Sequence, residues 1–511
     1  MITIPDFSRY VPPGVYVEDN SDPIVTSSGL PASVVAIIGP ALGYQTASET
    51  LQIYATTGVV LAQRGIFTTA VTGPPAIAAP VVKKLDGTLL AENTDYAFTV
   101  DSSGGGGSAN AVTTIQRIAN SPNIADGDTV VIAYAYADTT YYAPQLHEDY
   151  DTILAVYGLP MVSAAPTNPN TSPVASPLSL GAKVAIENGA NPILTIATNP
   201  NDGDLRAQFQ AAYAKIATNY ATTLVVPILP DDLTVTTGTV STFVQQLAQD
   251  LKSHCENASA GGYARIGFFG CPRNYSETDL SQEALAGSLG SKRLALLFPH
   301  NLSMFNASTN QVGEVCGSYL AAAAVGKLSS LPTAYGLTKQ SLSSFQGIPT
   351  AVSQKMTKAY KDSLSGSGVM VVEIDRLNRL TVRHGVATNM SALNTREISM
   401  TRIADTLYAM VQLGMEAADL IGAPIDAEMT SRVKAALTSI LEQAVLSEVI
   451  VGYTDLKVRQ QTPPSGDPSV IECKFAYQPA VPLNYIVVQF QLNLVTGEIN
   501  DETATDIPVS A

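Results

Sequence analysis

The stretch TLVVPIL at residues 223 to 229 is apolar at nearly every position and shows no alternation of polar and apolar side chains. Further runs of the same kind are SVVAIIG at 33 to 39, ILTIA at 193 to 197, ARIGFF at 264 to 269 and LALLF at 294 to 298. Stretches with helical spacing, such as 205 to 220 and 240 to 254, separate these runs. Strands that are apolar on both faces and alternate with helices predict a mainly parallel sheet covered on both sides.

Residues 50 to 145 have a different pattern. Short runs that alternate polar and apolar residues, LLAENTDYAFTV at 89 to 100 and GDTVVIAYAYAD at 127 to 138, follow turn dipeptides such as Asp86-Gly87. This pattern predicts an all-β domain inserted into an α/β domain made of residues 23–49 and 146–350. The predicted fold class is therefore multidomain α/β and α+β.

The last third of the chain predicts a separate C-terminal domain, residues 351–497. Two long amphipathic helices are expected at 398 to 421 and 427 to 453, joined by the Gly/Pro break at 422 to 424. YIVVQFQLNLV at 485 to 495 alternates with the period of a strand. Residues 1–22, with PPGVYVEDN at 12 to 20, and residues 498–511 are predicted to be extended terminal arms.

Charge and composition exclude several classes of protein. The net charge is -16, with 44 acidic and 28 basic residues, which disfavours a nucleic-acid partner. No apolar run approaches the roughly 18 residues of a membrane span, and the N-terminus lacks a secretory signal pattern. The four cysteines are widely spaced, as in a protein made in a reducing cytosol.

The sequence offers no motif for catalysis, for a cofactor or for a metal. AGSLG at 286 to 290 lacks the first glycine of a nucleophile elbow, and VGKLSS at 325 to 330 is interpreted as a helix that ends at Gly326, not as a phosphate loop. The four histidines do not have metal-ligand spacing. We therefore expect no catalytic, cofactor-binding or metal-binding residue, and no enzyme.

Three segments together resemble the core of contractile-tail sheath proteins of bacteriophages. These are LPTAYGLTKQSLSSFQGI at 331 to 348, GVMVVEIDRLNRLTVRHGVATN at 368 to 389 and REISMTRIADTL at 396 to 407. The PPGVYVED arm, AIENGANPIL at 185 to 194 and the inserted domain, expected on the outer surface, are similar to the same family in the same order.

This resemblance implies a structural protein that assembles with copies of itself. Hexameric rings would stack as a helical sleeve around a tail tube, with baseplate and tail-terminator proteins at the ends. Contraction would drive the tube through the host cell envelope and deliver the genome. The expected location is the virion tail, after assembly in the host bacterial cytoplasm, with neither direct nucleic-acid binding nor membrane insertion.

The resemblance also suggests which residues join the subunits. Gly14 would bend the N-terminal arm, and Val15, Tyr16 and Val17 would add a strand to a neighbour, although pairing within their own domain is the alternative. The expected arm-receiving strand carries Val487, Val488, Phe490 and Leu492. The tube-facing helix would carry Arg432 and Lys434, although a solvated helix face explains these charges equally.

Two further hypotheses concern charged residues of the C-terminal domain. Arg376, Arg379 and Arg383 could meet the acidic termini of neighbouring subunits, and Arg396 could form a buried contact with Asp405.

Two other functions stay open at this stage. An α/β hydrolase-like enzyme with an accessory β domain would explain the parallel strands, and a secreted surface-layer or adhesive protein would explain the acidic, tryptophan-free composition.

Overall fold

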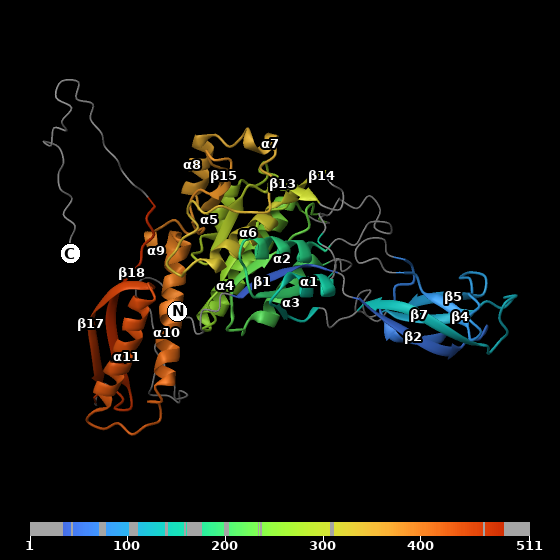
Figure 1. Ribbon diagram of the computed structural model, residues 1–511, viewed down its shortest axis with the longest axis horizontal. Coiled ribbons are helices and arrows are strands. Elements are labelled where there is room, and N and C mark those ends of the chain that lie inside the picture. Colours follow the sequence, from blue (N-terminus) through green and yellow to red (C-terminus); the bar gives the residue numbers. More distant parts are fainter. Residues whose placement is uncertain are drawn as a thin grey trace.

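The computed structural model describes residues 34–41, 44–70, 78–101, 111–137, 142–157, 160, 176–198, 204–233, 235, 238–306, 311–462 and 466–484. These residues form an elongated α/β structure in which a large sheet with its helices occupies the middle (Figure 1). A group of short strands lies at one end of the long axis, and a unit of helices with a β-hairpin lies at the other. Within the described ranges no helix is long and apolar enough to cross a membrane.

The central sheet has eight strands in the order β16-β15-β12-β11-β10-β1-β9-β8. They are β1 Val34–Pro40, β8 Gln145–His147, β9 Ile193–Thr198, β10 Thr222–Pro227, β11 Ile266–Gly270, β12 Leu294–Phe298, β15 Val369–Ile374 and β16 Leu380–Val382. Every pairing is parallel except those of the two edge strands, β8 and β16. The prediction of a mainly parallel sheet is therefore confirmed, and the five apolar runs are five of its inner strands.

Helices cover both faces of this sheet. They are α1 Tyr150–Tyr157, α2 Pro177–Glu187, α3 Leu205–Ile216, α4 Val240–Ala260, α5 Gln282–Leu289, α6 Gly317–Ser330, α7 Thr350–Ser353 and α8 Lys358–Gly366. Ile37 belongs to the core cluster shared with α2 and α6, whereas its neighbours Ala36 and Ile38 belong to the cluster shared with α3, α4 and α5. The side chains of β1 thus fill two cores, because successive residues of a strand point to opposite faces.

Helix α6 runs through the core, and the prediction that it ends at Gly326 is wrong. The helix continues to Ser330, and it crosses α2 so closely that a Cβ atom on Gly326 would lie 2.2 Å from the carbonyl oxygen of Ala185. The glycine therefore permits a close approach of two backbones and does not end the helix. Before α6 the chain forms an antiparallel hairpin, β13 Asn301–Asn306 and β14 Gln311–Cys316.

A buried carboxylate marks the start of α6. Asp231 is 2% exposed, and its Oδ1 accepts a hydrogen bond of 2.9 Å from the backbone N–H of Cys316. Its Oδ2 has no hydrogen-bond partner among the described residues. Burial raises the pKa of Asp231 to about 6, although the Cys316 hydrogen bonds and the charge of Arg273 act in the opposite direction.

The chain between β1 and β8 forms only strands in its described part. They are β2 Tyr44–Gln52, β3 Val59–Arg64, β4 Val81–Lys84, β5 Tyr96–Asp101, β6 Val112–Arg117 and β7 Thr129–Ala137. The strands make two three-stranded sheets, β2-β7-β4 and β3-β6-β5, which share one core cluster with Ile53, Ile115 and Ile132 at its centre. These residues lie apart from the central sheet, at one end of the molecule (Figure 1).

The other end is formed by the last described elements: α9 Leu393–Arg396, α10 Ile398–Ala417, α11 Met429–Leu446, β17 Ile450–Gln460 and β18 Ile471–Pro479. The expected second helix is too long, because residues 450 to 453 begin a strand. Glu448 lies in the left-handed region with φ 57, which ends the helix before the β-branched run of residues 449 to 451. The first helix also ends early, before Asp419, which has φ 51.

Candidate assembly surface

Helices α10 and α11 and the antiparallel hairpin β17–β18, which we call the ribbon, form a unit with its own core. Ile403 and Leu407 of α10 and Leu437 and Leu441 of α11 are buried together. Gly414 lets the two helices approach, since a Cβ atom there would lie 2.6 Å from Ile440 Cδ1. We call this unit the C-terminal lobe.

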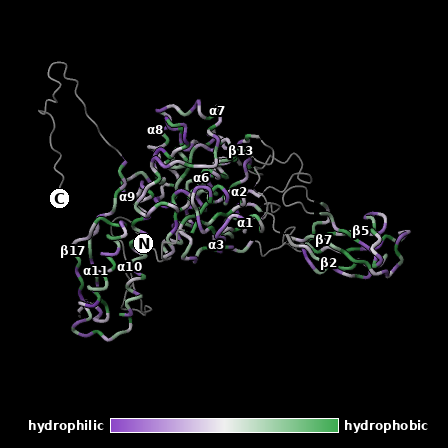
Figure 2. The backbone as a smooth tube through the Cα atoms, viewed as in Figure 1, coloured by the Kyte–Doolittle hydropathy of each residue, from purple (hydrophilic) through white to green (hydrophobic). Residues whose placement is uncertain are grey.

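One face of the ribbon completes this core. Tyr453 and Leu456 of β17 and Phe475 and Tyr477 of β18 pack against it. In Figure 2 the backbone of the lobe alternates between hydrophilic and hydrophobic colours, as expected for elements with one buried face. Among the described residues each ribbon strand pairs only with the other, so both outer edges of the ribbon carry unpaired backbone groups.

A buried ion pair attaches the lobe to the central sheet. Arg293, which precedes β12, donates hydrogen bonds of 2.7 and 2.9 Å to the two carboxylate oxygens of Asp405 on α10. The two side chains are 3% and 13% exposed. The predicted contact between Arg396 and Asp405 is wrong: Asp405 pairs with Arg293, and Arg396 lies 3.8 Å from Glu397. Bidentate geometry at low exposure fixes the orientation of α10 on the body.

A second arginine supports the same junction. Arg402 of α10 is 8% exposed and donates a hydrogen bond of 3.2 Å to the carbonyl oxygen of Leu331, which follows α6. Burial lowers the pKa of Arg402 to about 10.

The segment that leads to the C-terminal residues is held at the root of α10. Glu397, which is 1% exposed, accepts a hydrogen bond of 3.1 Å from Asn484 Nδ2, and its carboxylate also lies 2.6 Å from His384 Nε2. Asn484 is the last residue that the structure describes. The last described residue is therefore held beside α9 and α10.

The two residues predicted to face the tube lie on α11. Leu437 and Leu441 belong to the lobe core and Val433 is buried, while Arg432 and Lys434 are exposed. Arg432 Nη2 lies 2.6 Å from Asp426 Oδ2, so part of its charge is neutralised within the chain. Lys434 has no ion pair within 4 Å among the described residues.

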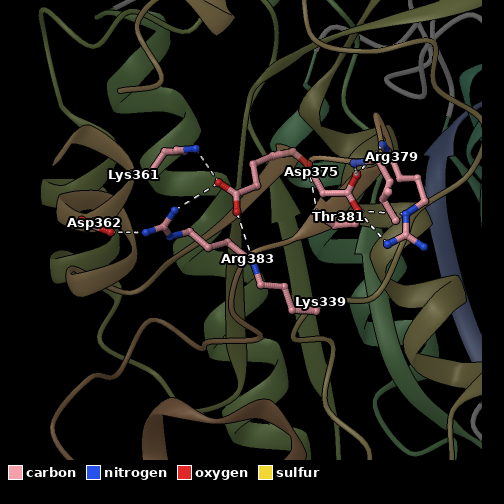
Figure 3. A network of polar contacts seen from close by, with 9 residues as sticks. Lys339, Lys361, Asp362, Asp375, Arg379, Thr381 and Arg383 are labelled. Atoms are coloured by element: carbon pink, nitrogen blue, oxygen red, sulfur yellow. Dashed lines mark hydrogen bonds and ion pairs between the residues drawn. The ribbon is translucent and has the colours of Figure 1, made fainter. Parts of the chain in front are cut away.

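The arginines predicted to meet neighbouring termini are partly engaged within the chain. Lys339, Lys361 and Arg383 lie 3.4, 2.6 and 3.2 Å from the carboxylate of Glu373. Figure 3 shows these three cations directed at one carboxylate. Burial opposes ionisation of Glu373, but these cations outweigh it and hold the pKa below its usual value.

The other two arginines of that cluster differ from each other. Arg379 pairs with Asp375 at 2.8 Å, and Arg376 is exposed. Of the three arginines, Arg376 is therefore the one most open to a partner.

The residues predicted for the arms lie outside the described residues. This holds for Gly14, Val15, Tyr16 and Val17, and for Val487, Val488, Phe490 and Leu492. They remain predictions.

The four histidines lie in separate places and contact structural partners. His147 contacts Thr152 and Thr195, His254 contacts Arg265, His300 contacts Gln282, and His384 contacts Glu397. Burial, with the charge of Arg265, lowers the pKa of His254 to about 3. Among the residues that the structure describes, no group of three or more His, Cys, Asp or Glu side chains could hold a metal ion.

Comparison with known proteins decides the family. The "Tail sheath protein" of Mycobacterium phage Bxz1 is 31% identical over 445 residues, which cover 86% of this chain and 70% of that protein. The chain belongs to the tail sheath protein family. The "Tail sheath protein" of Bacillus phage SP01 is similar to this sheath protein at 28% identity over 143 residues, or 28% of this chain and 24% of the relative. Compared with models of protein families, the sheath protein matches none.

Solved structures show the same fold. The helical sheath of the anti-feeding prophage in its contracted state is similar with a TM-score of 0.53 at 11% identity, over 95% of this sheath protein and all 100% of that chain. A chain of the 6-fold symmetrised baseplate of the same prophage is similar with a TM-score of 0.53 at 13% identity, again over 95% and 100%.

Proposed function

We propose that the protein polymerises with copies of itself, as hexameric rings stacked in a helical sleeve around a tail tube, and contracts to drive the tube through the host cell envelope during genome delivery. The identity of 31% over 445 residues to a phage tail sheath protein carries this proposal. The sleeve assembles in the host bacterial cytoplasm and forms part of the virion tail. Baseplate and tail-terminator proteins bind its two ends.

The proposed domains follow the core clusters in part, since β15 and β16, which belong to the proposed C-terminal domain, lie in the central sheet. Residues 23–49 and 146–350 form the α/β sheath domain, and residues 50–145 form an inserted β domain on the outer surface. Residues 351–497 form a C-terminal domain that faces the tube, and residues 1–22 and 498–511 are linker arms. In support, β2 to β7 share one cluster, and α10, α11 and the ribbon share another.

The arms link the subunits by adding strands to a neighbour's sheet. Residues 14 to 17 supply the N-terminal strand, and the strand with Val487, Val488, Phe490 and Leu492 lies in the receiving sheet. The open edges of the ribbon support this arrangement, because a two-stranded sheet is marginally stable by itself and its unpaired backbone groups accept further strands.

Exposed apolar side chains of the lobe give further support. Leu446, Val451 and Leu483 are 78%, 58% and 77% exposed. Large apolar side chains of this kind are common where another protein binds.

The energy for contraction is stored during assembly as the difference between two packings of the subunits. Linkers at residues 20 to 23 and 498 to 501 rotate while the added strands stay paired. An assembled, extended sheath should therefore contract equally well with inhibitors of nucleotide hydrolysis, and a nucleotide requirement would contradict the proposal.

Electron microscopy of the purified protein tests the function. We expect striated cylinders from the full chain and soluble single subunits from a chain that lacks residues 1 to 19. Circular dichroism serves as the folding control for the truncated chain. Compact particles from the full chain would favour an enzyme, flat lattices would favour a surface-layer protein, and normal cylinders from the truncated chain would refute the role of the arm.

A further inference from the structure

The outer face of the ribbon carries an arrangement of charge that the fold itself does not explain. Lys457 of β17 lies directly opposite Lys474 of β18 in the antiparallel register, and both side chains are exposed. Residues directly opposite in such a pair have Cβ atoms about 4.5–5.5 Å apart, so two like charges there destabilise the ribbon. This pairing of two cations occurs in a chain whose net charge is -16.

The two lysines are only partly balanced by neighbouring charge: the carboxylate of Glu472, which is paired with Arg459, also attracts Lys474. Neither forms an ion pair within 4 Å with any described residue. The adjacent cross-strand pair, Arg459 and Glu472, is satisfied internally at 2.7 Å. The opposite face of the ribbon is occupied by the lobe core, so the lysine pair is on the free face.

The chain itself contains a segment of complementary charge. Residues 498 to 506 read EINDETATD, with four carboxylates: Glu498, Asp501, Glu502 and Asp506. No Lys or Arg occurs between residues 485 and 511. Carboxylates placed against two ammonium groups would relieve their repulsion and form charge-assisted hydrogen bonds.

We infer that the lysine pair Lys457–Lys474 receives the acidic segment 498 to 506 of a second copy of the chain. The inference rests on the proposed sheath function, in which each subunit lies beside further copies. Backbone pairing at the ribbon edge does not depend on the side chains of the added segment. The lysine pair, in contrast, would bind an acidic segment more tightly than a neutral or basic one. The contact should therefore weaken as ionic strength rises.

Exchange of the charges between two chains tests the inference. One variant reverses the ribbon, Lys457→Glu with Lys474→Glu, and the other reverses the tail, Glu498→Lys with Asp501→Lys and Glu502→Lys. Each variant alone places like charges together, and we expect about a tenfold rise in the protein concentration needed for cylinders to form. A mixture of the two variants restores opposite charges in every contact between unlike copies, so the mixture should assemble at the original concentration.

The outcomes separate the possibilities. A ribbon-reversed chain that assembles like the original would overturn the inference. A second result would also overturn it: the mixture of the two variants fails to assemble, but a single chain that carries both reversals does assemble. The tail would then bind the ribbon of its own chain. Absence of cylinders from the original chain would instead refute the proposed function, and in that case cross-linking of the mixed variants in solution decides whether the tail binds a second copy.

A neutral variant excludes a purely structural role. Lys457→Gln with Lys474→Gln removes the repulsion without reversing the charge. We expect this variant to unfold at a higher temperature than the original and to assemble less well. Reduced assembly together with a lower unfolding temperature would mean that the lysines only stabilise the fold.

Discussion

Replacement of Asp231 by Asn should change how stability depends on pH. The carboxyl group is 2% exposed and has a pKa of about 6, compared with the usual 3.8. Well below pH 3.8 the group is protonated in both the folded and the unfolded chain, so its contribution is fully present. As the pH rises toward 6 the unfolded chain releases the proton first, and the folded chain loses stability.

The size of this loss follows from the two pKa values. A difference from 3.8 to about 6, at about 1.4 kcal/mol for each pKa unit, corresponds to about 3 kcal/mol of unfolding free energy. The side chain of the Asp231→Asn variant would carry no charge at any pH, while its oxygen could still accept the hydrogen bond from Cys316. The variant should therefore gain about 2–3 kcal/mol relative to the original chain between pH 4 and pH 7.

Urea unfolding of both chains at pH 4, 5, 6 and 7 measures this difference, under conditions that keep the chains unassembled. The other titratable groups are common to both chains and cancel in the comparison. Asp232→Asn is the matched control, because that neighbouring carboxylate is 32% exposed in its pair with Arg273 and should change stability by less than about 1 kcal/mol. A difference between the Asp231→Asn variant and the original chain that stays constant from pH 4 to pH 7 would refute the reasoning.

Three further predictions concern the buried ion pair, the contact between α2 and α6, and the proposed tube surface. Asp405→Asn leaves Arg293 buried without its charge partner, and calorimetry should show a loss of about 3 kcal/mol; an unchanged unfolding temperature would contradict the buried pair. Gly326→Ala should destabilise the chain by about 1–3 kcal/mol, whereas Gly287→Ala in α5, with no atom within 4 Å, should stabilise it by up to about 1 kcal/mol. Lys434→Glu should weaken co-sedimentation of sheath with tube at low salt without changing the unfolding temperature, and equal co-sedimentation would remove this residue from the proposed tube surface.

Local sequence patterns were sufficient to predict the type of the main elements. Short runs such as TLVVPIL are apolar on both faces and alternate with stretches of helical spacing, so the parallel sheet could be predicted. The helices α10 and α11 could be predicted from their spacing, but not their last turns. By periodicity, residues 449 to 453 fit either a helix or a strand. They form a strand because the left-handed backbone at Glu448 ends the helix and the following residues pair with β18.

Which distant residues meet depends on how the elements pack in the folded chain. Asp405 pairs with Arg293, 112 positions away, because α10 crosses the chain just before β12, and nothing in local spacing indicates this partner. The sequence predicted that a helix ends at Gly326. In the structure this glycine lies inside α6, because α2 approaches too closely there for a side chain. The opposition of Lys457 and Lys474 depends on the bulges that set the register of the ribbon. Periodicity reports which face of an element is buried, but the partner on that face is a property of the folded chain.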